Sequence, residues 1–150
     1  MTGEGSGQKI LVDTNIVIYA WDQNEQAKRT RASRLLKTLA AQQTLVISTQ
    51  VLNEAFATLT RAPRGLRLAH IDAVQIIHDL ARISVVLPLN ATHTLLAVDA
   101  VSRHGLSFWD ALIWAVAKAA DIPTIYSEDF QHGRQIEGVQ FIDPFAAAQP

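Results

Sequence analysis

Ile10-Leu11-Val12-Asp13-Thr14-Asn15 is the stretch that decides the fold, because a short apolar run ends there abruptly in polar residues. An apolar run of this length, bounded by turn-forming residues, is typical of a strand buried on both faces. Similar runs recur along the chain. The predicted strands are residues 9–13, 44–48, 84–87, 123–127 and, more weakly, Val139–Ile142.

Helical spacing of apolar residues separates these strands. Ser107 can cap one helix, Gly105 can end the helix before it, and Asn90 or Thr92 can cap that earlier helix. The predicted helices are residues 16–21, 25–42, 50–61, 66–82, 91–103 and 108–120. Alternating strands and helices predict an α/β fold, a three-layer α/β/α sandwich around a central, mostly parallel sheet of four to five strands.

Composition fits one folded domain. The chain has 150 residues, of which 49% are hydrophobic and 18% charged, which excludes a disordered chain. We expect a flexible N-terminal tail at 1–8, one domain at 9–145 and a C-terminal tail at 146–150. The absence of cysteine excludes thiolate metal sites and suits a cytoplasmic protein. With a formal net charge of -1, any contact with nucleic acid must come from local patches.

Four acids stand where an acid is least expected: Asp13, Glu54, Asp110 and Asp129. Asp13 and Asp129 come at or just after the ends of predicted strands, where ligands bind in open α/β sheets. Asp110 opens a helix that is apolar on all sides, so its charge points into protein or into a cleft. We expect the four acids to converge at one edge of the sheet.

Each acid also has an ordinary explanation. Asp13 can belong to an Asp-Thr-Asn turn, and Glu54 is a common residue near a helix start. Asp110 can simply favour the helix dipole, a gain of roughly 0.3–1 kcal/mol, although Ser107 already supplies a cap. Glu128 and Asp129 can cap a short helix at 130–134. The joint arrangement is the stronger signal.

Grouped carboxylates need a counter-charge. Two of them about 4 Å apart repel by roughly 4 kcal/mol at an effective dielectric constant of 20. A set of oxygen ligands without cysteine favours Mg²⁺ or Mn²⁺ over zinc. Mg²⁺ usually keeps several water molecules, one of which can become a nucleophile.

Four segments resemble the signature segments of PIN-domain ribonucleases, most closely the VapC-type toxins of type II toxin–antitoxin systems. They are Val12-Asp13-Thr14-Asn15, Gln50-Val51-Leu52-Asn53-Glu54, Ser107-Phe108-Trp109-Asp110-Ala111 and Ser127-Glu128-Asp129-Phe130-Gln131-His132-Gly133. Each segment is short, but their order and spacing are together quite specific. The resemblance covers nearly the whole chain after the first eight residues.

The resemblance implies a Mg²⁺- or Mn²⁺-dependent endoribonuclease that is inhibited by a small VapB-like antitoxin. It places the catalytic and metal-binding roles on Asp13, Glu54, Asp110 and Asp129. Either Glu128 or Asp129 can face the metal, and the family pattern favours Asp129. Supporting polar positions match Thr14, Asn15 and Ser127. Apolar surface on the helices, including residues 66–80, also leads us to expect a homodimer.

Two basic groups are candidates for RNA contacts. Arg61, Arg64 and Arg67 crowd the loop after the Glu54 helix. Lys28, Arg31, Arg34 and Lys37 recur every three residues beside Arg29, as phosphate contacts or as an ordinary solvated helix face. Trp21 and Trp109 can stack on bases, whereas Trp114 is expected in the core. His104 and His132 are expected in loop or packing roles.

Other classes of protein fit less well. A phosphatase that uses an aspartyl nucleophile expects Asp-x-Asp where this chain has Asp13-Thr14-Asn15. A dinucleotide-binding fold expects a Gly-x-Gly-x-x-Gly motif after the first strand, and none is present. A PIN-like RNA-processing nuclease without a toxin role, and a chiefly protein-binding PIN-like module, remain alternatives.

Overall fold

A single six-stranded sheet organises the part of the chain that the computed structural model describes, residues 7–61 and 65–146. Its strands are β1 (Ile10–Val12), β2 (Leu45–Ser48), β3 (Val85–Leu87), β4 (Thr124–Tyr126), β5 (Gln135–Ile136) and β6 (Val139–Ile142). They lie in the order β3-β2-β1-β4-β6-β5, and only β5 is antiparallel to its neighbour. The expected mostly parallel sheet is confirmed, with β5 in addition.

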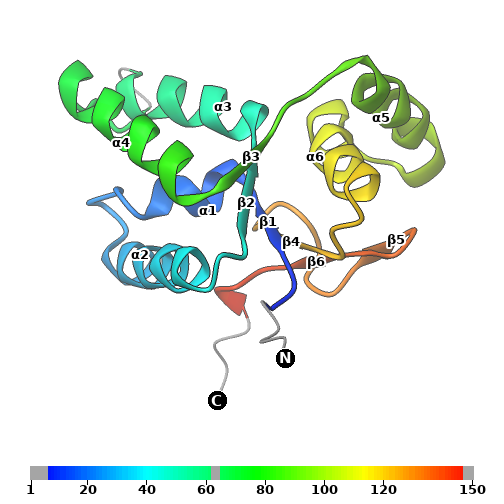
Figure 1. Cartoon of the computed structure of the whole chain (residues 1–150), viewed down its shortest axis with the longest axis horizontal. Helices are drawn as coiled ribbons and strands as arrows, with labels where there is room; N and C mark the ends of the chain where they lie inside the picture. The colour runs from blue at the N-terminus through cyan, green and yellow to red at the C-terminus, as the bar shows by residue number, and fades with distance from the viewer. Residues whose placement is uncertain (1–6, 62–64, 147–150) are drawn as a thin grey trace, which may run out of the picture.

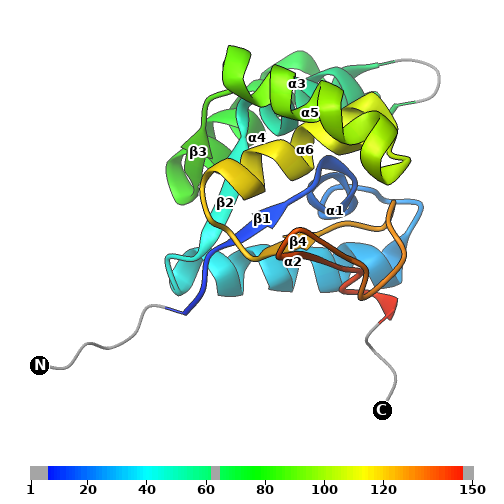
Figure 2. The ribbon, with the colours of Figure 1, turned by 90° about the vertical axis from the view of Figure 1, so that its right-hand side faces the viewer.

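Helices cover the sheet on two sides (Figure 1). They are α1 (Thr14–Tyr19), α2 (Gln26–Ala41), α3 (Thr49–Thr60), α4 (His70–Ile83), α5 (Ala91–His104) and α6 (Phe108–Ala119). Helices α1 to α4 lie on one side, while α6 lies across the other side with α5 packed outside it (Figures 1 and 2). This arrangement is the predicted three-layer sandwich.

Burial explains why the strands and α6 read as apolar runs. Leu11 and Val12 of β1 are fully buried. Every residue of α6 from Ala111 to Ala117 is at most 5% exposed. Trp114 lies in the core as predicted, and its indole N–H donates to the Ile136 carbonyl at 3.1 Å. That hydrogen bond satisfies the one polar atom of the ring.

The predicted caps of α5 and α6 are confirmed. Asn90 caps α5 in a capping box with His93, and the Ser107 hydroxyl accepts the Asp110 N–H at 3.1 Å to cap α6. Gly105 follows α5 in the left-handed region at φ 67, where a Cβ would be strained. Gly105 and Ser107 together fix where α6 begins and therefore where Asp110 lies.

Two elements differ from the prediction. Helix α4 begins at His70 rather than at residue 66, because the preceding segment bonds back to α3: the Leu66 and Leu68 N–H groups donate to the carbonyls of Thr58 and Leu59. Residues 130–134 form turns rather than the short helix considered as an alternative. There the Gly133 N–H donates to the Phe141 carbonyl at 2.7 Å, which holds the segment against β6.

Several predicted features fall on residues outside the described ones. They are most of the tails at 1–8 and 146–150, and Arg64 in the loop after α3. Within residues 7–61 and 65–146, no helix is both long and apolar enough to cross a membrane.

Candidate active site

Asp13 is held where β1 passes into α1. Its Oδ1 accepts the Thr14 N–H at 2.7 Å, and its Oδ2 accepts the Ser127 hydroxyl at 2.7 Å. Strand β4 pairs directly with β1, with Val12 opposite Tyr126, so Ser127 follows β4 at the same edge of the sheet as Asp13. The side chain is 8% exposed, which is unusually low for a carboxylate.

Burial is the main reason that the pKa of Asp13 is raised from 3.8 to about 6. The hydrogen bonds from Ser127 and Thr14 oppose this rise, while the negative charges of Asp129 and Glu54 add to it. Asp13 is therefore a carboxylate that its surroundings only partly stabilise in the charged form.

Glu54 reaches the same place from the second turn of α3. Its Oε1 accepts the Thr14 hydroxyl at 2.6 Å, and its Oε2 accepts the Gln50 side-chain amide at 3.4 Å. Thr14 thus donates its backbone N–H to Asp13 and its hydroxyl to Glu54. One threonine orients two acids that are 41 positions apart in the chain.

Asp129 completes the acidic lining of one cleft. Its backbone N–H donates to the Ser127 hydroxyl at 3.0 Å, so the same serine positions both Asp13 and Asp129. The cleft has a volume of about 500 Å³. Its lining includes Asp13, Thr14, Asn15, Tyr19, Asp22, Glu54, Arg61 and Asp129.

Asp110 approaches from the other helical layer, on the first turn of α6. It is half-buried and does not itself line this cleft. Burial raises its pKa, the Ser107 hydroxyl opposes that rise, and the charges of Asp129 and Glu54 add to it. The charges of Asp129 and Glu54 thus act on Asp110 as well as on Asp13, although Asp110 lies outside the cleft that the other three acids line.

Glu128 and Asp129 point to different partners although they are adjacent. Glu128 forms an ion pair with Lys28 at 2.7 Å and accepts the Tyr19 hydroxyl at 2.8 Å. These contacts tie the β4–β5 connection to α1 and α2. Of the two acids, it is Asp129 that lines the cleft.

The carboxylate oxygens of the four acids suit a hard cation, although the side chains do not converge closely enough to coordinate one ion. In the described ranges 7–61 and 65–146, no three His, Asp or Glu side chains form a group that could hold a metal ion as they stand. The donors at this edge are oxygens, as Mg²⁺ prefers. Two further buried oxygens beside the acids, Asn15 Oδ1 and Gln50 Oε1, accept no hydrogen bond from the described residues. The residues therefore fit a cation chemically.

Some of the predicted basic residues line clefts in the structure, whereas others are held by structural contacts. Arg61 lines the acidic cleft, and Arg67 lines a cleft that adjoins it. Of the α2 stripe, Lys28 pairs with Glu128, and Arg31 donates to the carbonyls of Pro144 and Phe145 at 2.7 and 3.2 Å. These two have structural contacts, so the stripe is not one surface.

The remaining aromatic and histidine side chains mostly follow expectation. Trp109, next to Asp110, is 61% exposed. His104 contacts Glu137 at 2.7 Å, and His132 accepts the Asp143 N–H at 3.1 Å, so both have loop or packing roles. Sequence reasoning missed Gln50, whose spacing of four residues from Glu54 was the available signal, and Tyr19, for which no local pattern existed.

The α/β/α fold and its acidic edge define a recognisable class of protein. Residues 10–135 match the PIN domain, and the chain therefore belongs to the PIN domain family. No curated protein matches the chain in sequence.

Solved structures that share the fold include VapC toxins. VapC20 from Mycobacterium tuberculosis, described as a sarcin-ricin loop cleaving toxin, is 25% identical with a TM-score of 0.63, and the match covers 81% of this chain and 90% of that one. A toxin–antitoxin complex from Klebsiella pneumoniae matches at 17% identity and a TM-score of 0.65, over 91% of this chain and 98% of that one. DNA-bound VapBC from Salmonella typhimurium matches at 16% identity and a TM-score of 0.64, over 90% of this chain and 97% of that one.

Proposed function

We propose that this protein is a Mg²⁺-dependent endoribonuclease and the toxin of a toxin–antitoxin pair. The observation that carries the proposal is the convergence of Asp13, Glu54 and Asp129 on one cleft, with Asp110 coupled electrostatically to Glu54 and Asp129. Such a cluster of carboxylates repels any polyanionic substrate unless a cation intervenes. Membership of the PIN domain family and the likeness to VapC structures support the same chemistry.

The residues that would hold Mg²⁺ or Mn²⁺ are Asp13 and Asp110 as the firmest ligands, with Asp129 and Glu54 completing the set directly or through water. When bound, the cation would stabilise charge on the phosphate and lower the pKa of a water molecule. Thr14 and Ser127 orient the carboxylates through the hydrogen bonds already described. Glu54 or Asp129 would accept the proton of the attacking water. Water attacks the phosphorus, the bond to the 3′-oxygen breaks, and that oxygen takes up a proton, so the products carry 5′-phosphate and 3′-hydroxyl ends.

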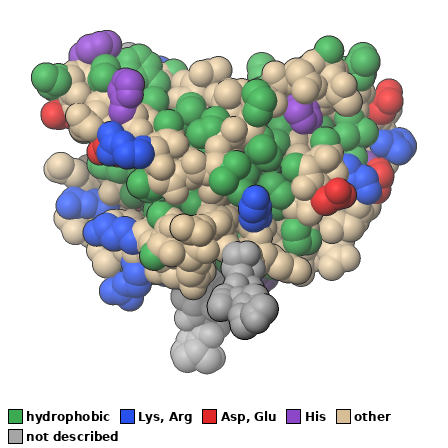
Figure 3. All heavy atoms as spheres, viewed as in Figure 1, with side chains coloured by type: hydrophobic (Ala, Val, Ile, Leu, Met, Phe, Trp, Pro, Cys, Tyr) green, Lys and Arg blue, Asp and Glu red, His purple; other side chains and the backbone are tan. Residues whose placement is uncertain are grey.

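The toxin role implies a VapB-like antitoxin, and the apolar surface of the helices implies a homodimer. Several similar structures are described as toxin–antitoxin complexes. In Figure 3 hydrophobic side chains gather around the hollow between the two upper lobes of the molecule. Exposed apolar residues on α4, β3 and α5 support self-association, among them Ile83, Val85, Leu95 and Val98.

The nuclease proposal is tested by incubating purified protein with total cellular RNA in Mg²⁺ or in EDTA and mapping the new ends. We expect the wild type to cleave RNA in Mg²⁺ but not in EDTA and to leave 5′-phosphate ends. We expect Asp110→Asn to cleave no RNA. Full cleavage by Asp110→Asn, or cleavage in EDTA, would reject it. The toxin role has a separate test, because expression of the wild type should arrest bacterial growth and Asp110→Asn should not.

A further inference from the structure

A groove leads away from the acidic cleft toward α2. The acidic cleft shares Ile18, Asp22 and Thr58 with a second cleft of about 590 Å³, which Arg67 also lines. The second cleft shares Trp21, Gln23 and Leu68 with a third of about 640 Å³. The second cleft thus adjoins both of the others, so a strand bound at the acids has a path to α2.

The third cleft, which we call the basic basin, is lined by three cations of α2. Arg29, Arg34 and Lys37 span about 12 Å along the helix. No described residue forms an ion pair or hydrogen bond with these three side chains, whereas Lys28 and Arg31 on the same helix are engaged. No acid is among the residues that line the basin. Figure 3 shows Lys and Arg side chains gathered where α2 lies.

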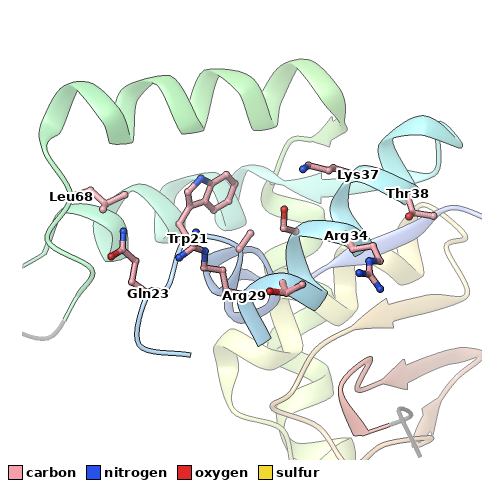
Figure 4. Close-up of a pocket in the computed structure, with 10 residues that line it drawn as sticks. Trp21, Gln23, Arg29, Arg34, Lys37, Thr38 and Leu68 are labelled. Atoms are coloured by element: carbon pink, nitrogen blue, oxygen red, sulfur yellow. The ribbon is translucent and has the colours of Figure 1, made fainter. Parts of the chain in front are cut away.

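Trp21 places an aromatic ring among these charges. It comes from the segment after α1 and lines both the second cleft and the basin. In Figure 4 the indole lies between Leu68 and Gln23 on one side and the α2 residues Arg34, Lys37 and Thr38 on the other. The basin also carries hydroxyls, from Thr30, Ser33 and Thr38. Cations, hydroxyls and one aromatic face are the groups that hold single-stranded nucleic acid.

We propose that the basic basin binds an unpaired stretch of the RNA substrate several nucleotides from the scissile bond. Arg29, Arg34 and Lys37 hold phosphates there, and Trp21 stacks on an unpaired base. The inference rests on the proposed nuclease function, since it places this stretch on the same strand that enters the acidic cleft. A protein segment fits less well, because the basin offers few apolar anchors and three unpaired cations.

The test measures binding rather than cleavage. The probe is a fluorescently labelled single-stranded RNA of about 16 nucleotides, the upper end of single-strand site sizes, and affinity is read by anisotropy in EDTA. Arg34→Gln/Lys37→Gln is compared with Arg82→Gln/Arg103→Gln. This control removes the same charge from exposed residues outside the groove.

We expect the basin variant to weaken binding about tenfold and to lower the slope of log affinity against log salt by about 1.4, for two lost phosphate contacts. The control should change affinity less than about twofold. Equal weakening by both variants would show that only net charge matters and would overturn the proposal. Unchanged affinity in both, as expected if the basin receives a protein, would also overturn it.

Trp21 is tested by Trp21→Ala and Trp21→Phe against the same RNA and against its duplex. We expect Trp21→Ala to bind the single strand about tenfold more weakly, Trp21→Phe to bind nearly as the wild type, and the duplex to be indifferent to both. Equal loss for strand and duplex would contradict base stacking. If Trp21→Ala does not fold, the Arg34/Lys37 comparison still decides whether the basin binds the strand.

Failure of the nuclease function is distinguishable from failure of the basin. Asp110→Asn should bind the probe in EDTA at least as tightly as the wild type, because it removes a negative charge, and should cleave nothing in Mg²⁺. Cleavage by Asp110→Asn would reject the catalytic assignment while leaving the basin measurement intact. Tight binding by the basin variant would reject the basin while leaving the catalytic assignment intact.

Discussion

Asp13 shows at the scale of a single residue how a buried carboxylate at the candidate site lowers stability. A carboxylate that is 8% exposed keeps two hydrogen bonds, yet burial still raises its pKa to about 6. The folded protein therefore holds a proton on Asp13 more tightly than the unfolded chain, whose value is near 3.8. Stability falls as pH rises from about 4 to about 6, and the cost is complete above that range.

Replacing Asp13 by Asn should accordingly stabilise the metal-free protein at neutral pH. The difference between 3.8 and about 6 corresponds to about 3 kcal/mol, so we expect a gain of roughly 1–3 kcal/mol in the free energy of unfolding at pH 7.5. The gain should shrink toward zero near pH 4. Urea unfolding in EDTA at both pH values measures it. A variant less stable than the wild type at pH 7.5 would contradict the assignment of cause.

Glu128 and Asp129 give a second comparison between neighbouring residues. Asp129→Asn removes a carboxylate from the cleft, and we expect cleavage to slow by at least about a hundredfold, a typical loss for electrostatic stabilisation. Glu128→Gln removes only the partly exposed ion pair with Lys28 and should cost about 1 kcal/mol of stability or less. Initial cleavage rates and urea unfolding check both. Equal loss of activity in the two variants would mean that Glu128 also acts in the cleft.

The sequence predicted single residues best where local context is unusual. Asp110 in a helix that is apolar all round and Asp13 after an apolar strand were identifiable because their neighbours make a charge costly. The family pattern favoured Asp129 over Glu128, but local context could not decide between them, because the position of Glu128 depends on Lys28, which lies 100 positions away. The sequence also could not tell which cations of α2 are free, because Arg31 is held by carbonyls more than 110 positions away.

Helix α6 shows how one element positions a catalytic candidate. The Ser107 cap fixes the first turn, and Asp110 lies on that turn. Short-range signals of this kind, the caps at Asn90, Gly105 and Ser107, were all readable from sequence. The start of α4 and the strand β5 were not, because hydrogen bonds to α3 and to β6 decide them.

Ser107→Ala should destabilise α6 and hold Asp110 less firmly in its position. We expect a loss of about 1 kcal/mol in unfolding free energy and a measurable fall in cleavage rate, whereas Ser107→Thr keeps the hydroxyl and should lose less of both. Thermal unfolding and cleavage rates are compared for the two variants. If Ser107→Ala matched Ser107→Thr in both readouts, the cap would not be what positions Asp110.

At the scale of the whole molecule, the parallel sheet brings separate segments to one edge. Strands β1 and β4 are neighbours, so the residues that follow them meet, while α3 and α6 contribute from opposite layers. A bound cation would relieve the resulting repulsion among the four carboxylates. Occupancy of that site should therefore stabilise the entire fold.

Mg²⁺ or Mn²⁺ should raise the melting temperature of the wild type in a concentration-dependent way. At a concentration a hundredfold above Kd the expected gain is about 2.7 kcal/mol, or several degrees for a chain of this size. Asp110→Asn should show a smaller shift in melting temperature. Arg82→Gln, at an exposed ion pair on α4 that does not line the acidic cleft, should show the same shift as the wild type. Equal shifts in all three proteins would place the bound cation elsewhere.

The most direct measurement is an anomalous difference map from a crystal soaked in Mn²⁺. We predict a peak within about 2.0–2.6 Å of carboxylate oxygens from Asp13 and Asp110, with Asp129 and Glu54 beside it directly or through water. A peak at other residues, or no peak between these four acids in a protein that still cleaves RNA, would contradict the account.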